Sequence, residues 1–131
     1  AFDKKAVKRV IVCSGKVYFE LVERRKALGI KDIAIVRIEQ LYPFHAELAK
    51  KIIGTYPKTA ERCYVQEEPR NAGAYIYAAD FFREQAGIDL KYIGRNASAT
   101  PCVGSKRADK AQQEAVLTAA IGAKPKDDKK K

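Results

Sequence analysis

The adjacent carboxylates Glu67 and Glu68 are the side chains best placed by type and spacing for acid–base chemistry. They follow a short apolar run, where the carboxyl end of a parallel strand would lie, and ligands of open α/β sheets bind at that edge. Neighbouring carboxylates can also perturb each other's pKa. Consecutive residues of a continuing strand point to opposite faces, however, so the pair is poorly arranged to cooperate. We therefore expect a structural role, with one carboxylate bridging or capping and the other solvated.

Two basic side chains are expected at the same edge of the sheet. Arg95 ends the next apolar run, so it is placed to form an ion pair with Glu67 or Glu68, within the fold or across an interface. The turn Ser14-Gly15-Lys16 lies between a strand and a helix start, where backbone amides can meet an anion. One glycine and one lysine are a weak signal, and a plain strand-to-helix turn is the simpler interpretation.

Nucleophilic and metal-dependent catalysis find little support in the sequence. The only histidine, His45, follows Pro43 and Phe44 at the start of a short expected helix, where a surface or capping role is usual. No Cys/His or Asp/Glu cluster has metal-ligand spacing. Neither a Walker-type loop nor a Gly-x-Gly-x-x-Gly turn is present. We therefore expect no catalytic residue and no metal site in this chain.

Cys13, Cys63 and Cys102 are too few and too scattered for a disulfide framework or a zinc ribbon. Cys13 and Cys63 lie in or at the end of apolar runs, where a free cysteine behaves as a small buried hydrophobe. This usage favours a reducing compartment.

The net charge of +10 is concentrated at the two ends of the chain. Residues 1–9 and 123–131 together supply +6, which leaves +4 for the 113 residues between them. We interpret 1–6 as a linker from an upstream region, 7–122 as one domain, and 123–131 as a solvated, flexible tail. The charge alone therefore gives little support to nucleic-acid binding.

Short β-rich runs alternate with helical segments along the whole chain. Helical spacing of apolar residues is clearest between Lys16 and Leu28, which Gly29 ends. Strands are expected at 10–13, 32–38, 62–66 and 90–93, and helices at 16–28, 46–53, 74–85 and 106–121. This order predicts an α/β sheet with right-handed crossovers and helices on both faces.

Five blocks of sequence resemble, in order and spacing, the C-terminal domain of the 2-oxoglutarate dehydrogenase decarboxylase family. They are residues 7–18, 32–44, 66–75 and 94–104, and the pair Gln112-Gln113. The resemblance implies a three-layer sandwich with a mostly parallel, mixed five-stranded sheet, as in transketolase-like enzymes. Three residues depart from the family pattern: Ala72 stands for Gln, Tyr75 for Trp and Ala108 for His.

The resemblance also implies a function for the longer enzyme. That enzyme of the tricarboxylic acid cycle decarboxylates 2-oxoglutarate on thiamine diphosphate with Mg²⁺ and passes the succinyl group to a lipoyl-bearing succinyltransferase core. The resemblance places the cofactor and substrate residues upstream, so this chain is expected to hold no cofactor. It would close the homodimer and support the active-site domains, in the mitochondrial matrix or, alternatively, the bacterial cytoplasm.

The resemblance assigns two sets of residues. Some family members bind acetyl-CoA or adenine nucleotides on this domain, and the candidate anion contacts here are Ser14, Lys16, Arg37 and Arg95. Structural or interface roles are implied for Glu67, Glu68, Asn71, Gln112 and Gln113.

Two further hypotheses remain open. The altered loops and basic ends fit a domain detached from its enzyme and reused as a structural subunit of a large assembly, including a mitochondrial one that contains RNA. A nucleotide-binding module of flavodoxin-like shape is the other hypothesis, and it rests on fold analogy alone.

Overall fold

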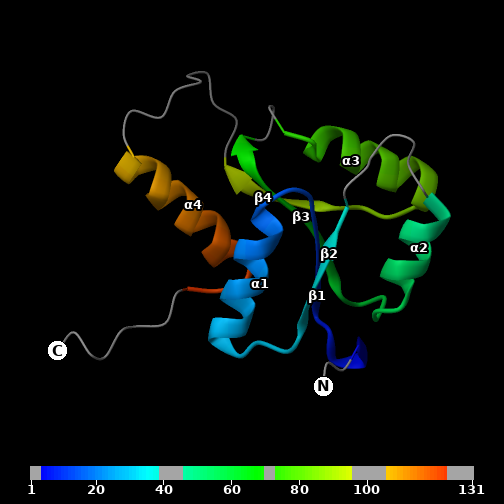
Figure 1. The fold of residues 1–131 in the computed structure, drawn as a ribbon. Coiled ribbons are helices and arrows are strands. Elements are labelled where there is room, and N and C mark those ends of the chain that lie inside the picture. The colour runs from blue at the N-terminus through cyan, green and yellow to red at the C-terminus, as the bar shows by residue number, and fades with distance from the viewer. Residues whose placement is uncertain (1–3, 39–45, 70–72, 96–105, 124–131) are drawn as a thin grey trace.

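Four parallel strands form the centre of the protein in the computed structural model, which describes residues 4–38, 46–69, 73–95 and 106–123 (Figure 1). The strand order is β2-β1-β3-β4. The strands are β1 (Arg9–Cys13), β2 (Ile33–Arg37), β3 (Glu61–Pro69) and β4 (Lys91–Arg95). Each is separated from the next along the chain by at least one helix, as parallel neighbours require.

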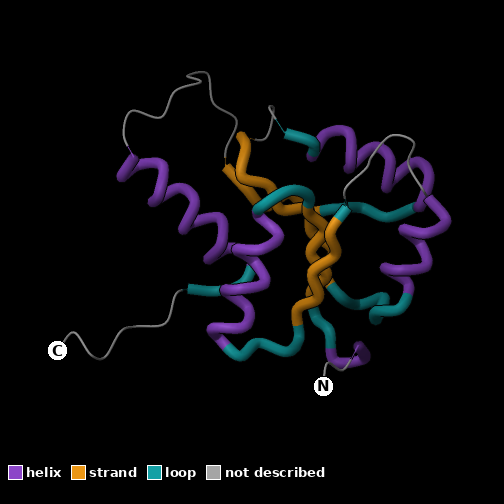
Figure 2. The backbone as a smooth tube through the Cα atoms, viewed as in Figure 1, coloured by secondary structure: helices purple, strands orange, loops and turns teal. Residues whose placement is uncertain are grey.

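Helices cover both faces of this sheet. Figures 1 and 2 show α1 and α4 on one side of the strands and α2 and α3 on the other, which makes three layers. The helices are α1 (Val17–Leu28), α2 (Ala46–Gly54), α3 (Tyr75–Phe81) and α4 (Lys106–Ala120). A 3₁₀ turn, η1 (Lys4–Ala6), precedes β1, and a π-helical turn, η2 (Phe82–Ala86), continues α3. Along the described ranges, no helix is long and apolar enough to cross a membrane.

The expected α/β class and the three layers are confirmed, but the expectation of a mixed five-stranded sheet is wrong for the described residues. The sheet there has four strands, all parallel. The next described element after β4 is α4, a helix that packs onto β3 and β4. The expected strand at 62–66 also extends farther, to Pro69, with an irregular register between Val65 and Pro69.

Side chains alternate along β1 and so enter apolar cores on both faces of the sheet. Ile11 and Cys13 face α1 and α4, where they pack with Leu21 and Val116. Val12 faces the other way and packs with Phe82. Because both faces of the strand are covered, its residues form a continuous apolar run. Cys13 and Cys63 are buried and form no disulfide with another described residue, and burial raises the pKa of the Cys63 thiol to about 11, so the buried-hydrophobe interpretation is confirmed for both.

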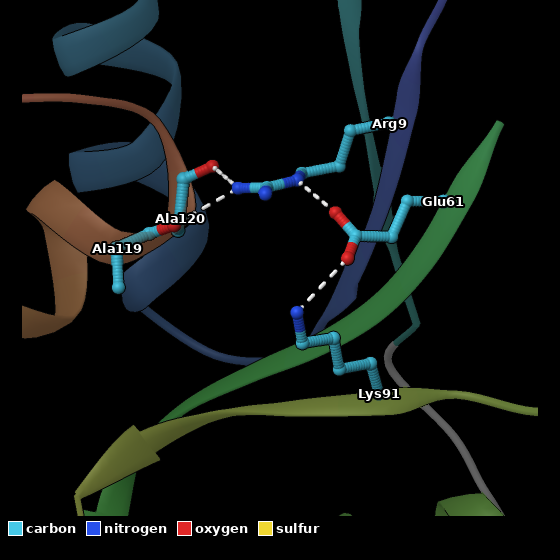
Figure 3. A network of polar contacts seen from close by, with 5 residues as sticks. All are labelled: Arg9, Glu61, Lys91, Ala119 and Ala120. Carbon is cyan, nitrogen blue, oxygen red and sulfur yellow. Dashed lines mark hydrogen bonds and ion pairs between the residues drawn. The ribbon is translucent and has the colours of Figure 1, made fainter.

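Charged side chains fasten the C-terminal end of α4 to the amino edge of the sheet (Figure 3). The Arg9 guanidinium donates from Nε to Glu61 Oε1 at 2.8 Å, and from Nη1 to the carbonyl oxygens of Ala119 at 2.9 Å and Ala120 at 2.7 Å. Lys91 Nζ donates to the other Glu61 oxygen at 3.0 Å, and this contact, with Arg9, holds the pKa of that carboxyl below its usual value. A cation at a helix C-terminus also complements the helix dipole.

Candidate functional site

A polar junction forms at the opposite, carboxyl edge of the sheet around the side chain of Gln113 in α4. Gln113 Oε1 accepts a hydrogen bond from Arg95 Nη2 at 3.1 Å. Gln113 Nε2 donates to Glu20 Oε1 and to Glu67 Oε1, each at 3.1 Å. One amide therefore joins α1, β3, β4 and α4. We call Glu20, Glu67, Arg95 and Gln113 the carboxyl-edge junction.

The chemistry of a primary amide explains why glutamine occupies the centre of this junction. Its nitrogen carries two hydrogens and its oxygen accepts, so it can bind two carboxylates and a guanidinium at once. Glu67 and Arg95, which were expected to pair, meet here through Gln113. The four side chains of the junction thus bind one another and connect four elements of the fold. This arrangement is that of a structural cross-link.

The strand geometry separates the two adjacent carboxylates as alternation requires. Glu67 is half-buried and follows the side of β3 that carries Val65 in the α1/α4 core, whereas Glu68 is exposed. Burial raises the pKa of the Glu67 carboxyl above its ordinary value. The Glu20 carboxylate raises the pKa further, Lys16 lowers it, and Glu68 raises it again, while the hydrogen bond from Gln113 lowers it.

Replacing Glu67 with glutamine is expected to raise the melting temperature at pH 7. Because the folded-state pKa is raised, ionised Glu67 costs stability at neutral pH, and this cost disappears as the pH falls below the unfolded value of about 4. Glutamine removes the charge but still accepts from Gln113. Melting curves of the variant and the original chain should therefore converge near about pH 4. Glu23→Gln, an exposed change on α1, is the control; a lower melting temperature for Glu67→Gln at pH 7 would contradict this prediction.

Replacing Gln113 with leucine is expected to lower the free energy of unfolding by roughly 1–2 kcal/mol, because it removes the hydrogen bonds to Glu20, Glu67 and Arg95 together. The matched control is Gln112→Leu, since Gln112 is exposed on the same helix. Urea denaturation measures both. Equal effects of the two changes would show that the junction contributes no stability.

A second polar residue at this edge, Gln66, was not expected from the sequence. It is 4% exposed, and its Oε1 accepts from the Tyr75 backbone N–H at 2.9 Å, which caps the start of α3. Its Nε2 donates to the Glu68 carbonyl oxygen at 3.2 Å. A Cβ at Gly73 would lie 2.5 Å from Gln66 Oε1, so glycine there makes room for the cap. The only sequence signal was a glutamine inside an apolar strand.

The candidate anion contacts have different partners in the fold. The Ser14 hydroxyl lies 3.2 Å from the hydroxyl of the buried Tyr64. Arg37, which is exposed, lies over the rings of Tyr18 and Phe19. Arg95 belongs to the carboxyl-edge junction, where Lys16 acts on Glu67 through its charge. Arg95 thus contacts the junction directly and Lys16 acts on it through its charge, whereas Arg37 packs against aromatic rings.

The remaining candidate residues fall in two groups. Gln112 is exposed on α4. Asn71, His45 and Cys102 lie outside the described residues. In the ranges that are described, no three His, Cys, Asp or Glu side chains are grouped so that they could hold a metal ion.

Comparison with known proteins gives one consistent result. The family model described as 2-oxoglutarate dehydrogenase C-terminal matches residues 1–121. The chain is 45% identical over 121 residues to the 2-oxoglutarate dehydrogenase E1 component of Haemophilus influenzae, covering 91% of this chain and 13% of that protein. It is 43% identical over 125 residues to the E1 component of Rickettsia felis, and the match covers 92% of this chain and 13% of that protein. The chain is 44% identical over 117 residues to the E1 component of Cupriavidus necator, and the match covers 88% of this chain and 12% of that protein.

Proposed function

The chain belongs to the 2-oxoglutarate dehydrogenase C-terminal family, and we propose that it serves as the non-catalytic, structural C-terminal domain of an E1 component. The full polypeptide would decarboxylate 2-oxoglutarate and transfer the succinyl group to lipoyl groups. The observation that carries this proposal is the family match over residues 1–121. The chain spans about an eighth of the length of the relatives named above, so the activity belongs to the larger protein.

The geometry of the carboxyl edge supports a structural role. This is the edge at which α/β proteins usually bind ligands. Here the half-buried polar side chains are bound to one another: Gln113 holds Glu20, Glu67 and Arg95, and Gln66 holds the start of α3. Such links fix the relative positions of helices and strands, which is what a supporting domain needs.

The same proposal assigns the surroundings of the domain. We propose residues 7–122 as the domain, residues 1–6 as the link from an upstream region, and residues 123–131 as a tail that follows the domain. Thiamine diphosphate and Mg²⁺ bind in the upstream domains, where they provide the decarboxylation chemistry. A second copy and a lipoyl-bearing succinyltransferase core are the partners. The relatives named above are bacterial, which favours the bacterial cytoplasm over the mitochondrial matrix.

The comparisons bear differently on the detached-subunit hypothesis and on the predicted effector site. The relatives named above are E1 components, so the comparisons give no support to a detached subunit of an RNA-containing assembly. A nucleotide or acetyl-CoA site at Ser14, Lys16, Arg37 and Arg95 stays a prediction. Calorimetry with acetyl-CoA and AMP tests it, and binding that Lys16→Gln abolishes would support it.

Mass spectrometry of the protein as it occurs in its source cells tests the proposed function. We expect peptides of this chain in a polypeptide roughly seven to eight times the matched length, in the fraction that oxidises 2-oxoglutarate. Finding the chain only as a 131-residue polypeptide, in fractions without that activity, would overturn the proposal.

A further inference from the structure

Large apolar side chains at the surface are distributed unequally between the two helical layers. Among the described residues, Leu48 on α2 is 55% exposed, and Ile76 and Tyr77 on α3 are 47% and 66% exposed. On the other layer only Phe19 of α1, at 57%, belongs to this group of described residues. Single exposed apolar residues are common, but Ile76 and Tyr77 are neighbours in the first turn of α3 and so form a patch.

The outer side of α3 combines this apolar patch with a charged border. Ala78 and Phe82 are buried and face the sheet. Ile76, two residues before Ala78, therefore lies on the opposite side of the helix. Asp80 and Arg83 follow Ile76 by about one and two turns, and their side chains bind each other at 2.7 Å. Protein interfaces combine apolar centres, rich in aromatic residues, with polar rims, so this surface has the composition of a docking site.

The chain enters the domain on the side of the sheet that carries α2 and α3. Val7, which follows η1, is buried and packs with Val10 and with Tyr56, just after α2. Val10 shares a face of β1 with Val12, which packs with Phe82 at the end of α3. Figure 1 shows η1 on the same side of the strands as α2. A polypeptide that precedes η1 therefore approaches the domain from the α2 and α3 side.

We infer that the outer side of α3 docks this domain onto the preceding domains of the E1 component, with Ile76 and Tyr77 at the centre of the contact. The inference rests on the proposed function. The match covers 13% of the Haemophilus influenzae E1 component, so most of that polypeptide lies outside the matched segment. The segment that joins it to this domain arrives on the α2 and α3 side. A fitting partner surface is an apolar hollow that receives Ile76 and the Tyr77 ring, with polar groups at its border.

Photocrosslinking tests the inference in the full-length E1 component, assembled with its succinyltransferase core. Tyr77 is replaced by photoreactive benzoylphenylalanine, and the crosslinked peptides are identified by mass spectrometry. We expect a crosslink to a peptide from the preceding domains of the E1 component. The matched control places the same group at Phe19, an aromatic residue of similar exposure on the other layer. Ile76→Asp should reduce the Tyr77 crosslink to the level of this control, whereas Ile76→Leu, which keeps the surface apolar, should retain it.

Three results would overturn the inference. The first is a Tyr77 crosslink to the preceding domains that is no stronger than the one from Phe19, and the second is a crosslink that Ile76→Asp leaves unchanged. The third is a crosslink from Tyr77 to this same domain of a second copy or to the succinyltransferase core, which would assign the surface to that partner. The 2-oxoglutarate dehydrogenase activity of the unmodified enzyme is measured in parallel. An active enzyme without the expected crosslink rejects the docking surface alone, whereas absence of the chain from any E1 polypeptide rejects the proposed function as well.

Discussion

Replacing Arg24 with alanine is expected to lower the free energy of unfolding by roughly 3 kcal/mol. The Arg24 side chain is 8% exposed and joins the two helices of one face. Its Nη2 donates to Glu114 Oε1 at 2.6 Å, and its Nη1 donates to the carbonyl oxygen of Gly122 at 3.0 Å. The change removes both charge-assisted bonds and leaves a cavity between α1 and the end of α4.

A matched arginine separates this effect from the loss of any surface ion pair. Arg83 also binds a carboxylate, Asp80 Oδ1, at 2.7 Å, but both side chains are more than half exposed. Arg83→Ala is therefore expected to change stability by less than about 0.5 kcal/mol. Urea denaturation at pH 7 measures both variants. A loss below about 1 kcal/mol for Arg24→Ala would show that the Arg24 contacts contribute little to holding α4 against α1.

Replacing Gly94 with alanine is expected to cost roughly 2–3 kcal/mol, because the site has no room for a methyl group. A Cβ there would lie 2.6 Å from the Tyr92 hydroxyl oxygen and 2.9 Å from the backbone oxygen of Gln66. The second atom belongs to the neighbouring strand, so it cannot rotate away. Glycine is therefore required at position 94 because there is no space for a larger residue between β3 and β4.

Gly54 provides the control for this prediction. A Cβ at Gly54, in α2, would meet nothing within 4 Å, and alanine is the better helix former. Gly54→Ala is therefore expected to be neutral or to stabilise by about 0.5–1 kcal/mol. Thermal melts should show a lower melting temperature for Gly94→Ala and an unchanged or higher one for Gly54→Ala. A Gly94→Ala variant as stable as the original chain would mean that β3 and β4 can separate without cost.

The sequence predicted the order and type of the elements because each has a strong local signal. Gly29 and Gly87 end their helices with positive φ, as expected for left-handed C-caps. The end of β3 was harder to place, because Glu67 and Glu68 look like a polar loop. They remain in the strand because Glu67 binds Gln113 across the layer, which is a tertiary contact with no local signal.

The candidate site was predicted only in part for the same reason. Glu67 and Arg95 lie at one edge because β3 and β4 are parallel, and the carboxyl ends of parallel strands meet at the same edge of the sheet. That Gln113 joins them to Glu20 depends on how α1 and α4 pack. The placement of Arg37 over Tyr18 and Phe19 likewise requires β2 to lie beside β1. Spacing along the chain specifies neither arrangement.

Domain exchange tests the central claim most directly. This chain replaces the matching C-terminal segment of the Haemophilus influenzae E1 component, to which it is 45% identical. The exchanged enzyme, the original and a form that lacks the segment are compared for 2-oxoglutarate decarboxylation and for oligomeric state. A structural domain predicts that the exchanged enzyme is active and assembled, whereas the shortened form is neither. A shortened form with full activity and unchanged assembly, or decarboxylation by this chain alone, would contradict the account.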